Sequence, residues 1–186
     1  MRICVAITGA SGAVLGQRTL ENLREHEVHL VVSDSARRVI ALELGERASL
    51  LADYEYPNQD IAAPLASSSF VLDAMVVVPC SMKTLAGIAH GYADNLILRC
   101  AENMLRFNRR LVLVPRETPL SLSAIENMRQ ARLAGAIILP PVMAYYFEPK
   151  SVDDVTDFFV GKVLDALSIE HHLFRRWTGV PKGGEG

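Results

Sequence analysis

The stretch ICVAITGASGAVLGQRTLENL, residues 3–23, joins a short apolar run, a turn of small residues and an amphipathic helical segment. An apolar run without polar alternation is typical of a parallel strand that is buried on both faces. The turn at 9–12 would lead the chain into the N-terminus of a helix, where backbone N–H groups favour an anion. The stretch therefore predicts a strand–turn–helix unit of an α/β protein, with a ligand held at its turn.

The same alternation of apolar runs and helical segments continues along the 186-residue chain. Strands are predicted at 2–7, 28–32, 74–78, 111–114 and 136–139, and helices at 13–25, 35–46, 95–106 and 122–133. A last helix is expected to begin near Ser151, where Ser-Val-Asp-Asp is similar to a capping box. The segment 53–69, rich in Pro, Ala, Ser and Asn, is predicted to be a long functional loop. We therefore predict a single α/β domain, a doubly wound (Rossmann-like) parallel sheet with helices on both faces.

Composition and charge favour a small-molecule partner. The chain has 19 Lys and Arg against 21 Asp and Glu, a formal net charge of −2, which gives no broad basic surface for nucleic acid or an anionic membrane. Its three cysteines form no CxxC pair, so no metal site is predicted. No apolar run approaches the roughly 18 residues of a membrane span, and we expect a cytoplasmic protein without a targeting segment.

The turn after the first strand lacks the two most familiar nucleotide motifs. Its sequence TGASGA, residues 8–13, has neither the spacing of GxGxxG nor the Gly-Lys-Ser/Thr of a P-loop, so neither NAD nor ATP is favoured. Thr8 and Ser11 offer hydroxyl groups, and Gly9 and Gly12 let the backbone approach a planar or phosphorylated ligand. From this segment alone, a plain tight turn without a ligand is the alternative.

Further polar segments follow predicted strands, at the sheet edge where open α/β sheets bind ligands. Residues 79–87 (PCSMKTLAG) form a second hydroxyl-rich entry to a helix, and Ser33 follows the second strand, where a helix cap is the simpler interpretation. Arg116 and Glu117, between two prolines, combine a phosphate-binding cation with a carboxylate for proton transfer, or form a surface ion pair. The aromatic residues of LPPVMAYYFEP, 139–149, line an apolar pocket or plug the core.

Taken together and in this order, four segments of the sequence resemble one family. TGASGA, PCSMKTLAGIAHGYADNLILRCAE, VPRETPLS and LPPVMAYYFEPKSVDD are similar to the motifs of the flavin prenyltransferases, or UbiX/Pad1-like proteins. The resemblance runs from Ile3 to about Trp177 and implies an FMN-binding flavoprotein-like domain at 1–178, with a flexible tail at 179–186. It implies an enzyme that joins a dimethylallyl group from dimethylallyl phosphate to N5 and C6 of reduced FMN. The product, prenylated FMN, is the cofactor of UbiD-type decarboxylases.

The matching motifs identify which residues of this sequence correspond to the family's functional residues. The residues that the resemblance places against FMN are Gly9, Ala10, Ser11, Ser33, Ser81, Met82, Lys83, Thr84 and Arg116. The catalytic residues that it implies are Ser11, Glu43, Arg99 and Glu117, with Glu43 as the base near the flavin edge. The residues that it gives to the prenyl phosphate are Tyr146, Lys162 and Arg106. A departing phosphate needs cations and an acid near its oxygen atoms, and these side chains supply both. The resemblance also implies a dodecamer with sites near subunit junctions.

Two positions depart from the relatives, and two alternative functions stay open. Arg106 stands where relatives often carry lysine, and its planar guanidinium leaves the choice between a monophosphate and a pyrophosphate donor undecided. Ile61 stands where some relatives place a tryptophan, which removes one aromatic wall of the prenyl pocket. An FMN-dependent cysteine decarboxylase is one alternative, but the loop PPVMAYYFEP lacks the Asn and Trp of a PxMNxxMW-like loop. A non-catalytic flavin-binding subunit is the other, and retention of the implied catalytic residues argues against it.

One of the five histidines bears on the decarboxylase alternative. A cysteine decarboxylase depends on a histidine base, and His90 is the candidate for that role. The other four, His26, His29, His171 and His172, stand in charged or terminal contexts and are predicted to be solvated.

Overall fold

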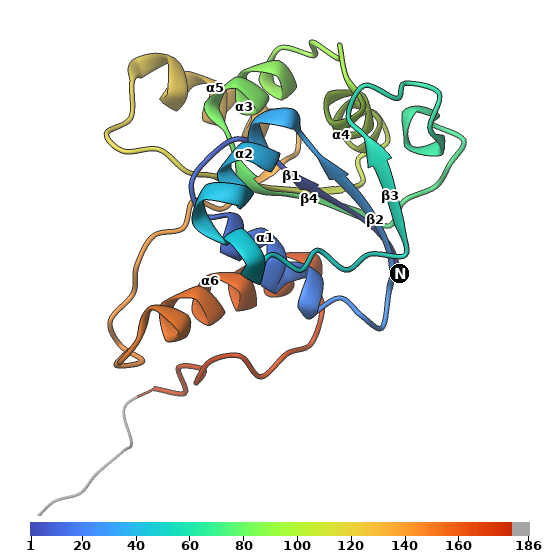
Figure 1. The fold of residues 1–186 in the computed structure, drawn as a ribbon. Coiled ribbons are helices and arrows are strands. Elements are labelled where there is room, and N and C mark those ends of the chain that lie inside the picture. Colours follow the sequence, from blue (N-terminus) through green and yellow to red (C-terminus); the bar gives the residue numbers. More distant parts are fainter. Residues whose placement is uncertain (180–186) are drawn as a thin grey trace, which may run out of the picture.

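A six-stranded sheet forms the centre of the computed structural model, which describes residues 1–179 (Figure 1). The strands are β1 (Arg2–Ile7), β2 (Glu27–Val32), β3 (Tyr54–Pro57), β4 (Ala74–Cys80), β5 (Arg110–Pro115) and β6 (Ile137–Ile138). Their order is β3-β2-β1-β4-β5-β6, and every neighbouring pair is parallel. This is the order of a doubly wound sheet, so the predicted fold class is confirmed.

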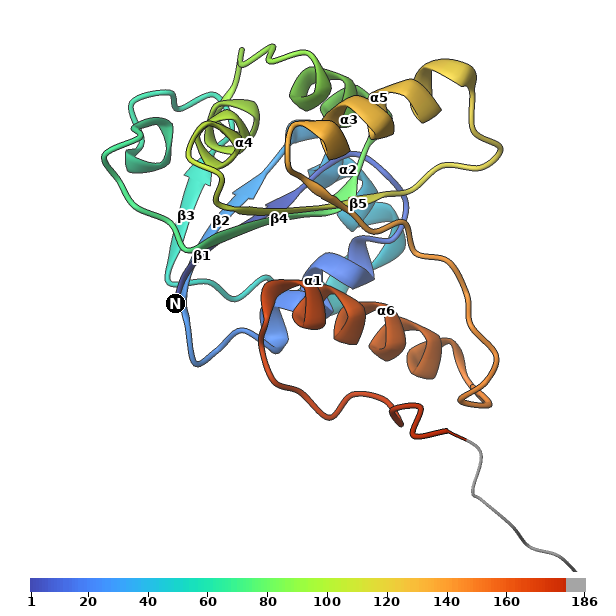
Figure 2. The same cartoon turned by 180° about the vertical axis from the view of Figure 1, so that it is seen from behind.

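Helices cover both faces of the sheet, as Figures 1 and 2 show from opposite sides. The helices are α1 (Ala13–Glu21), α2 (Asp34–Glu43), α3 (Met82–Ala89), α4 (Leu96–Arg106), α5 (Leu122–Leu133) and α6 (Val152–Leu167). Buried residues of α1, α2 and α6 join one core, and those of α3, α4 and α5 join the other. None of the helices in the described part of the chain is long and apolar enough to span a bilayer.

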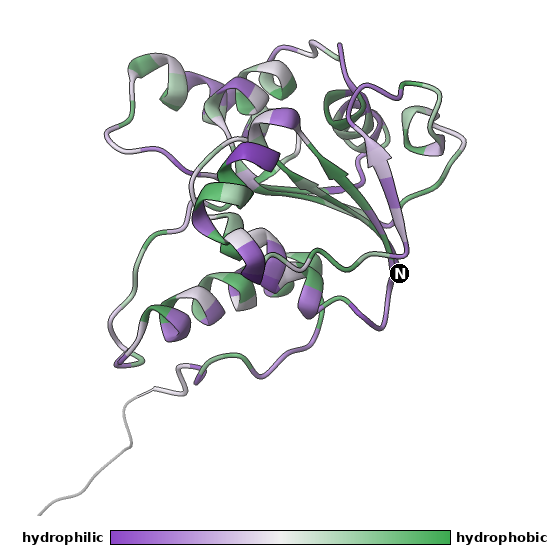
Figure 3. Ribbon diagram, viewed as in Figure 1, coloured by the Kyte–Doolittle hydropathy of each residue, from purple (hydrophilic) through white to green (hydrophobic). Residues whose placement is uncertain are grey.

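The two cores follow from the period of two along a strand. In β1, Ile3, Val5 and Ile7 belong to the core beneath α1 and α6, whereas Cys4 and Ala6 belong to the core beneath α3 and α4. The central strands are therefore apolar on both faces, which is why they are coloured as hydrophobic in Figure 3. This double burial accounts for the runs without polar alternation in the sequence.

The sheet reverses its winding between β1 and β4, and open α/β sheets bind their ligands at such a point. The buried Thr8 joins the two strands there. Its N–H and its hydroxyl group both donate to the carbonyl oxygen of Pro79, at 3.2 and 2.9 Å, and Oγ1 accepts the N–H of Ser81 at 2.7 Å. The turns at 9–12 and 79–81 consequently face one crevice.

Most predicted elements are present, with differences of a few residues at their ends. The predicted helix 122–133 has the bounds of α5, and Ser151 caps α6 in a capping box with Asp154. The prediction of one long loop at 53–69 was wrong, because β3 and a 3-10 turn, η2 (Pro64–Ala66), lie inside it. β3 is an edge strand with mostly exposed residues, so the hydrophobic pattern that marks a buried strand is missing.

Two of the four histidines predicted to be solvated are buried. The His29 side chain is 2% exposed, stacks on Tyr54 and Tyr56, and lies 2.9 Å from Glu27 Oε1 through Nε2. His171 is 8% exposed, and its Nε2 lies 3.1 Å from Asp165 Oδ1. Both rings have polar partners inside the fold, which compensates for their loss of water. The tail predicted at 179–186 lies outside the described residues from 180 onward.

Candidate functional site

The turn after β1 ends at the N-terminus of α1, and a carboxylate of the chain itself occupies that N-terminus. Gly12 is the N-cap residue at φ 101°, a left-handed conformation that favours glycine, and it has no side chain that could cap the helix. Glu43, from the end of α2, accepts the N–H of Gly12 at 3.0 Å and that of Ala13 at 2.8 Å. The Glu43 carboxylate thus occupies the helix N-terminus at which a ligand was predicted, and the contact of the turn at 9–12 with a ligand stays a prediction.

Glu43 is held in its ionised form. Partial burial raises the pKa of its carboxyl group, but hydrogen bonds from Ser11 and from the two helix N–H groups outweigh burial. The positive charge of Arg116 adds to this effect, so the pKa of Glu43 lies below its usual range. Glu43 therefore lies beside the turn at 9–12 at the switch point of the sheet, and the charge of Arg116 on the turn after β5 acts on it.

Glu43→Gln is expected to lower the free energy of unfolding at pH 7 by about 0.5–1 kcal/mol, because the amide oxygen still accepts N–H groups but carries no charge. The folded-state pKa of Glu43 is lowered, so its contribution is present above the unfolded value of about 4.3. It is lost as the pH falls through the folded-state pKa. Urea unfolding of both proteins from pH 7 downward measures this, with the exposed Glu46→Gln as control. A difference that does not change with pH would contradict the assignment.

Arg116 and Glu117 follow β5 on the same edge. The N–H of Arg116 donates to the carbonyl oxygen of Cys80 at 3.3 Å, which fixes the residue beside the end of β4. The Nε atom of Arg116 is buried and has no hydrogen-bond partner within residues 1–179. A buried N–H group without a partner is costly, and an acceptor atom of a ligand would satisfy it. Nη1 of Arg116 lies 4.0 Å from Oε1 of Glu117, a loose ion pair between half-exposed side chains.

A cavity of about 510 Å³ lies where α2, α3 and α4 begin. Its lining includes Ser33 and Ser35 from α2, Lys83 from α3 and Asn95 from α4. Ser33 caps α2 by accepting the N–H of Ala36, so the prediction of Ser33 as a cap is confirmed. Ser81 caps α3, and its Oγ also donates to Thr84 Oγ1. Arg38 and Lys83 line this cavity together with Asp34 and Asp94, so their charges balance and the helix N-termini are the groups that favour an anionic ligand.

Gly9 allows the turn after β1 to approach the start of α2. A Cβ atom at Gly9 would lie 2.4 Å from Oγ of Ser35, a distance that no side chain tolerates without movement. The approach brings the turn of β1 and the cavity at α2 into contact.

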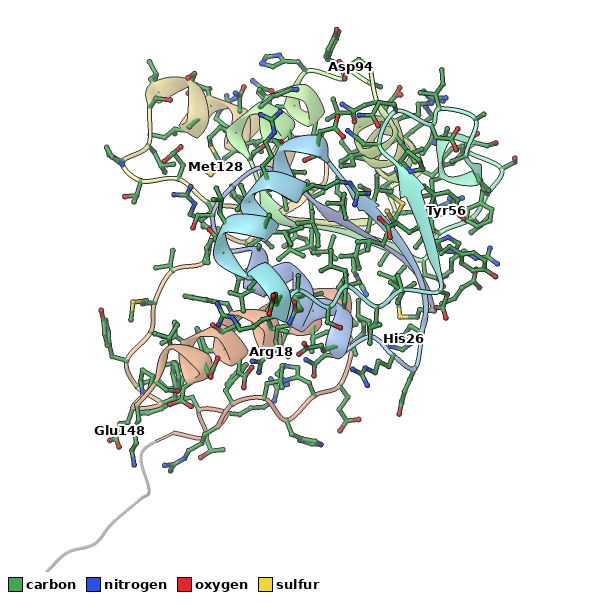
Figure 4. The ribbon with its side chains drawn as sticks, viewed as in Figure 1. Arg18, His26, Tyr56, Asp94, Met128 and Glu148 are labelled. Carbon is green, nitrogen blue, oxygen red and sulfur yellow. The ribbon has the colours of Figure 1, made fainter. Side chains whose placement is uncertain are left out.

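Tyr146 and Lys162 both lie beside Phe158, in a second place, an aromatic cluster formed by α6 and the segments on either side of it. The Tyr146 ring lies 6.1 Å from the Phe158 ring, and Lys162 Nζ lies 5.6 Å from the centre of that same ring. Trp177 contacts Tyr146 edge-on at 5.8 Å, beside a cavity of about 240 Å³. Figure 4 shows Glu148 of this loop and Asp94 of the larger cavity at opposite ends of the molecule. Within residues 1–179, the cavity at the starts of α2, α3 and α4 and the aromatic cluster lie apart.

The chain matches known proteins over most of its length. A family model described as Flavoprotein matches residues 1–164. The flavin prenyltransferase UbiX of Methanocaldococcus jannaschii is 48% identical over 185 residues, which cover 97% of this chain and 100% of that protein. This chain belongs to the UbiX family of flavin prenyltransferases. The resemblance found in the sequence is thereby confirmed.

Solved UbiX structures have the same fold as this UbiX-family chain. AnUbiX (PadA1), solved in complex with FMN and dimethylallyl pyrophosphate, is 48% identical with a TM-score of 0.92, over 96% of this chain and 98% of that one. A dodecameric FMN-dependent UbiX-like decarboxylase from Escherichia coli O157:H7 is 46% identical with a TM-score of 0.92, over 96% of this chain and 100% of that one.

The lining of the larger cavity contains residues that the sequence motifs did not identify. Asn58 accepts the N–H of Ile97 at 3.1 Å through its side chain and that of Leu96 at 2.8 Å through its carbonyl oxygen, which fixes the start of α4. Asn95, the N-cap of α4, lies in the same cavity lining. The Asp-Asn pair before the helical run was a cap signal that identified Asn95 only as the start of a helix. Nothing in the local sequence indicated Asn58.

The predicted UbiX-family phosphate ligand Arg106 lies away from the switch point within one chain. It is the last residue of α4, about 15 Å along the helix axis from Leu96. Helices that follow parallel strands run back across the sheet, so Arg106 lies near the opposite edge. Its role towards the donor phosphate stays a prediction.

Proposed function

We propose that this protein joins the dimethylallyl group of dimethylallyl phosphate to N5 and C6 of reduced FMN and releases inorganic phosphate. The observation that carries the proposal is the Glu43 carboxylate at the switch point, where it accepts the N–H groups of Gly12 and Ala13, in a chain of the UbiX family. FMN, as the acceptor substrate, supplies the nucleophilic N5 and C6 positions. The residues of the chain supply binding, charge and proton transfer.

FMN fits the residues around the crevice. The unpartnered Nε of Arg116 offers a charge-assisted hydrogen bond, and the cavity at the starts of α2 and α3 suits one phosphate group. Ser33 and Lys83 line that cavity, Ser81 caps the helix that carries Lys83, and the turn at Gly9 packs closely against Ser35. The solved complex of AnUbiX with FMN supports this choice of ligand.

Proton transfer is assigned to the two glutamates of the crevice. Glu43, held ionised beside Ser11, is the base for the proton lost when the flavin ring carbon is alkylated. Glu117, on the turn after Arg116, serves the departing phosphate. The overall step conserves atoms, because the C5H8 unit joins the flavin and the displaced proton leaves with the phosphate.

We propose that two groups of side chains bind the donor phosphate. Arg99 and Arg106 lie on α4, and Lys162 lies with Tyr146 at the aromatic cluster, away from α4 within one chain. A dodecamer would bring such groups from different subunits to one site. The dodecameric relative from Escherichia coli O157:H7 supports this assembly. Large apolar side chains exposed on the single chain, among them Leu122, Leu133 and Tyr145, support burial between subunits.

Decarboxylation is the second candidate function, since the relative from Escherichia coli O157:H7 is described as an FMN-dependent UbiX-like decarboxylase. His90, which a cysteine decarboxylase would use as its base, lies at the end of α3 and contacts Asn127 Oδ1 on α5 at 3.0 Å. This engagement with α5 favours a structural role for His90. The loop at 140–149 also lacks the Asn and Trp of the decarboxylases.

The proposal extends to location and to the consumer of the product. Cys4, Cys80 and Cys100 are all buried and free, which suits a reducing cytoplasm. A UbiD-type decarboxylase would receive the prenylated FMN.

Incubation with reduced FMN and dimethylallyl phosphate, followed by mass analysis of the extracted flavin, tests the proposed function. We expect a flavin heavier by one C5H8 unit and an equal amount of released phosphate. A bound flavin of unchanged mass would contradict prenyl transfer and favour a non-catalytic flavin-binding subunit. Release of CO2 from a peptide with a C-terminal cysteine would favour the decarboxylase.

A further inference from the structure

Glu102 bridges two arginines on the outer face of α4. Its Oε2 lies 2.5 Å from Nη1 of Arg99, and its Oε1 lies 2.6 Å from Nη2 of Arg106. The spacings of three and four residues place the three side chains on one stripe of the helix. Because each carboxylate oxygen takes one guanidinium group, Glu102 draws together two cations whose Cα atoms are two helical turns apart.

Arg99, at one end of this stripe, is tied to a neighbouring segment, whereas Arg106, at the other end, is hydrogen-bonded only to Glu102 within the described residues. Nε of Arg99 donates to the carbonyl oxygen of Ala66 at 3.2 Å, which ties the first arginine to η2. Arg106 is held by Glu102 alone among the residues that the structure describes. The side chains of Arg99, Glu102 and Arg106 are 33%, 30% and 46% exposed, so an anion can reach both guanidinium groups.

The two arginines retain most of their hydrogen-bonding capacity. A guanidinium group has five N–H donors, of which Arg99 uses two and Arg106 uses one within the described chain. The bridge leaves free N–H groups of both residues for phosphoryl oxygens. Its net charge is +1, because Glu102 cancels one of two positive charges. Burial raises the pKa of Glu102, but hydrogen bonds from Arg106 and Arg99 outweigh it, so the carboxylate stays ionised.

We propose that Glu102 is a positioning residue that sets the choice between phosphate donors. It aligns Arg99 and Arg106 for the phosphoryl oxygens, and it limits their joint charge to +1, which favours dimethylallyl phosphate over the more highly charged dimethylallyl pyrophosphate. This inference rests on the proposed function, in which both arginines hold the donor.

A purely structural role predicts a different outcome. Exposed ion pairs at these helix spacings contribute only about 0.3–0.5 kcal/mol each to stability. If Glu102 did no more than this, its removal would change stability slightly and would affect both donors equally.

Glu102→Gln separates the two roles, since glutamine keeps the shape of the side chain and removes its charge. With saturating reduced FMN, kcat/KM is measured for both donors in the wild type and the variant. We expect the ratio of monophosphate to pyrophosphate to fall about three- to tenfold, mainly through KM, the effect of one unit of exposed charge. Glu102→Asp keeps the charge but shortens the bridge, so it should retain the ratio and raise KM for both donors.

The matched control is Glu126→Gln, which breaks an exposed i,i+3 pair with Arg129 on α5 and should leave the ratio unchanged. Calorimetric titration of FMN-loaded protein with phosphate and with pyrophosphate gives the same ratio without turnover, should the variant be inactive. An active wild type with an unchanged ratio in Glu102→Gln would overturn the role of Glu102 alone. A wild type that prenylates FMN with neither donor would overturn the proposed function, and this inference with it.

Discussion

Glu117→Gln is expected to retain FMN and to slow prenyl transfer by about 10²- to 10⁴-fold, the usual contribution of a positioned acid or base. Oε1 of Glu117 accepts the N–H of Thr118 at 3.0 Å, and the amide oxygen of glutamine can keep this bond. The turn between Pro115 and Pro119 should therefore keep its shape. What the substitution removes is the carboxyl group that exchanges a proton with the departing phosphate or orders the cations around it.

Single-turnover measurement with reduced FMN and dimethylallyl phosphate reads this rate directly. The alternative is that Glu117 only neutralises Arg116, although their closest atoms are 4.0 Å apart and both side chains are more than a third exposed. In that case FMN affinity would change, and the rate at full flavin occupancy would not. A wild-type rate in the fully loaded variant would remove Glu117 from the mechanism.

Arg116→Met is expected to weaken FMN binding by about 10²-fold. Hydrogen bonds to a charged group contribute about 1.5–3 kcal/mol each, and the buried Nε of Arg116 has no other partner in the described chain. Methionine fills similar space without a polar atom, so the free energy of unfolding without ligand should not fall on account of this group. Loss of the arginine charge should also bring the pKa of Glu43 closer to its usual value.

Titration of the flavin fluorescence measures the affinity, and urea unfolding without FMN measures the stability. Arg129→Met, at an exposed position on α5, is the control and should bind FMN as the wild type does. FMN affinity within threefold of the wild type would show that Arg116 does not hold the flavin. A variant that no longer folds would contradict the claim that Arg116 serves the ligand more than the fold.

The elements that could be predicted from sequence are those whose signal is local. β1 is apolar on both faces, and α6 begins at a capping box that four consecutive residues encode. β3 has neither signal, because an edge strand with mostly exposed side chains is stabilised by pairing with β2 and not by its own pattern. The prediction that His29 is solvated failed for a related reason. Its charged neighbours in sequence suggested exposure, whereas Tyr54 and Tyr56, distant in sequence, cover its ring in the fold.

Some residues of the candidate site could likewise be predicted from local sequence, and others could not. The hydroxyl-rich turns and the Arg116–Glu117 pair follow strands, so the edge to which they belong could be predicted from order alone. Glu43 could not be placed by such reasoning, because it meets Gly12 from 31 residues away, across the packing of α2 against α1. Only the family resemblance assigned it to the site. The proposed donor site requires contacts between subunits, and such contacts leave no signature in the spacing of one chain.

Thr8 limits how far the ends of β1 and β4 can move apart at the switch point. With its three hydrogen bonds to Pro79 and Ser81, this one buried residue ties the ends of β1 and β4 together. The floor of the crevice consequently cannot widen unless those bonds break. We therefore expect the exchange of a bound flavin to depend on movement of the turns around the crevice and not on separation of β1 from β4.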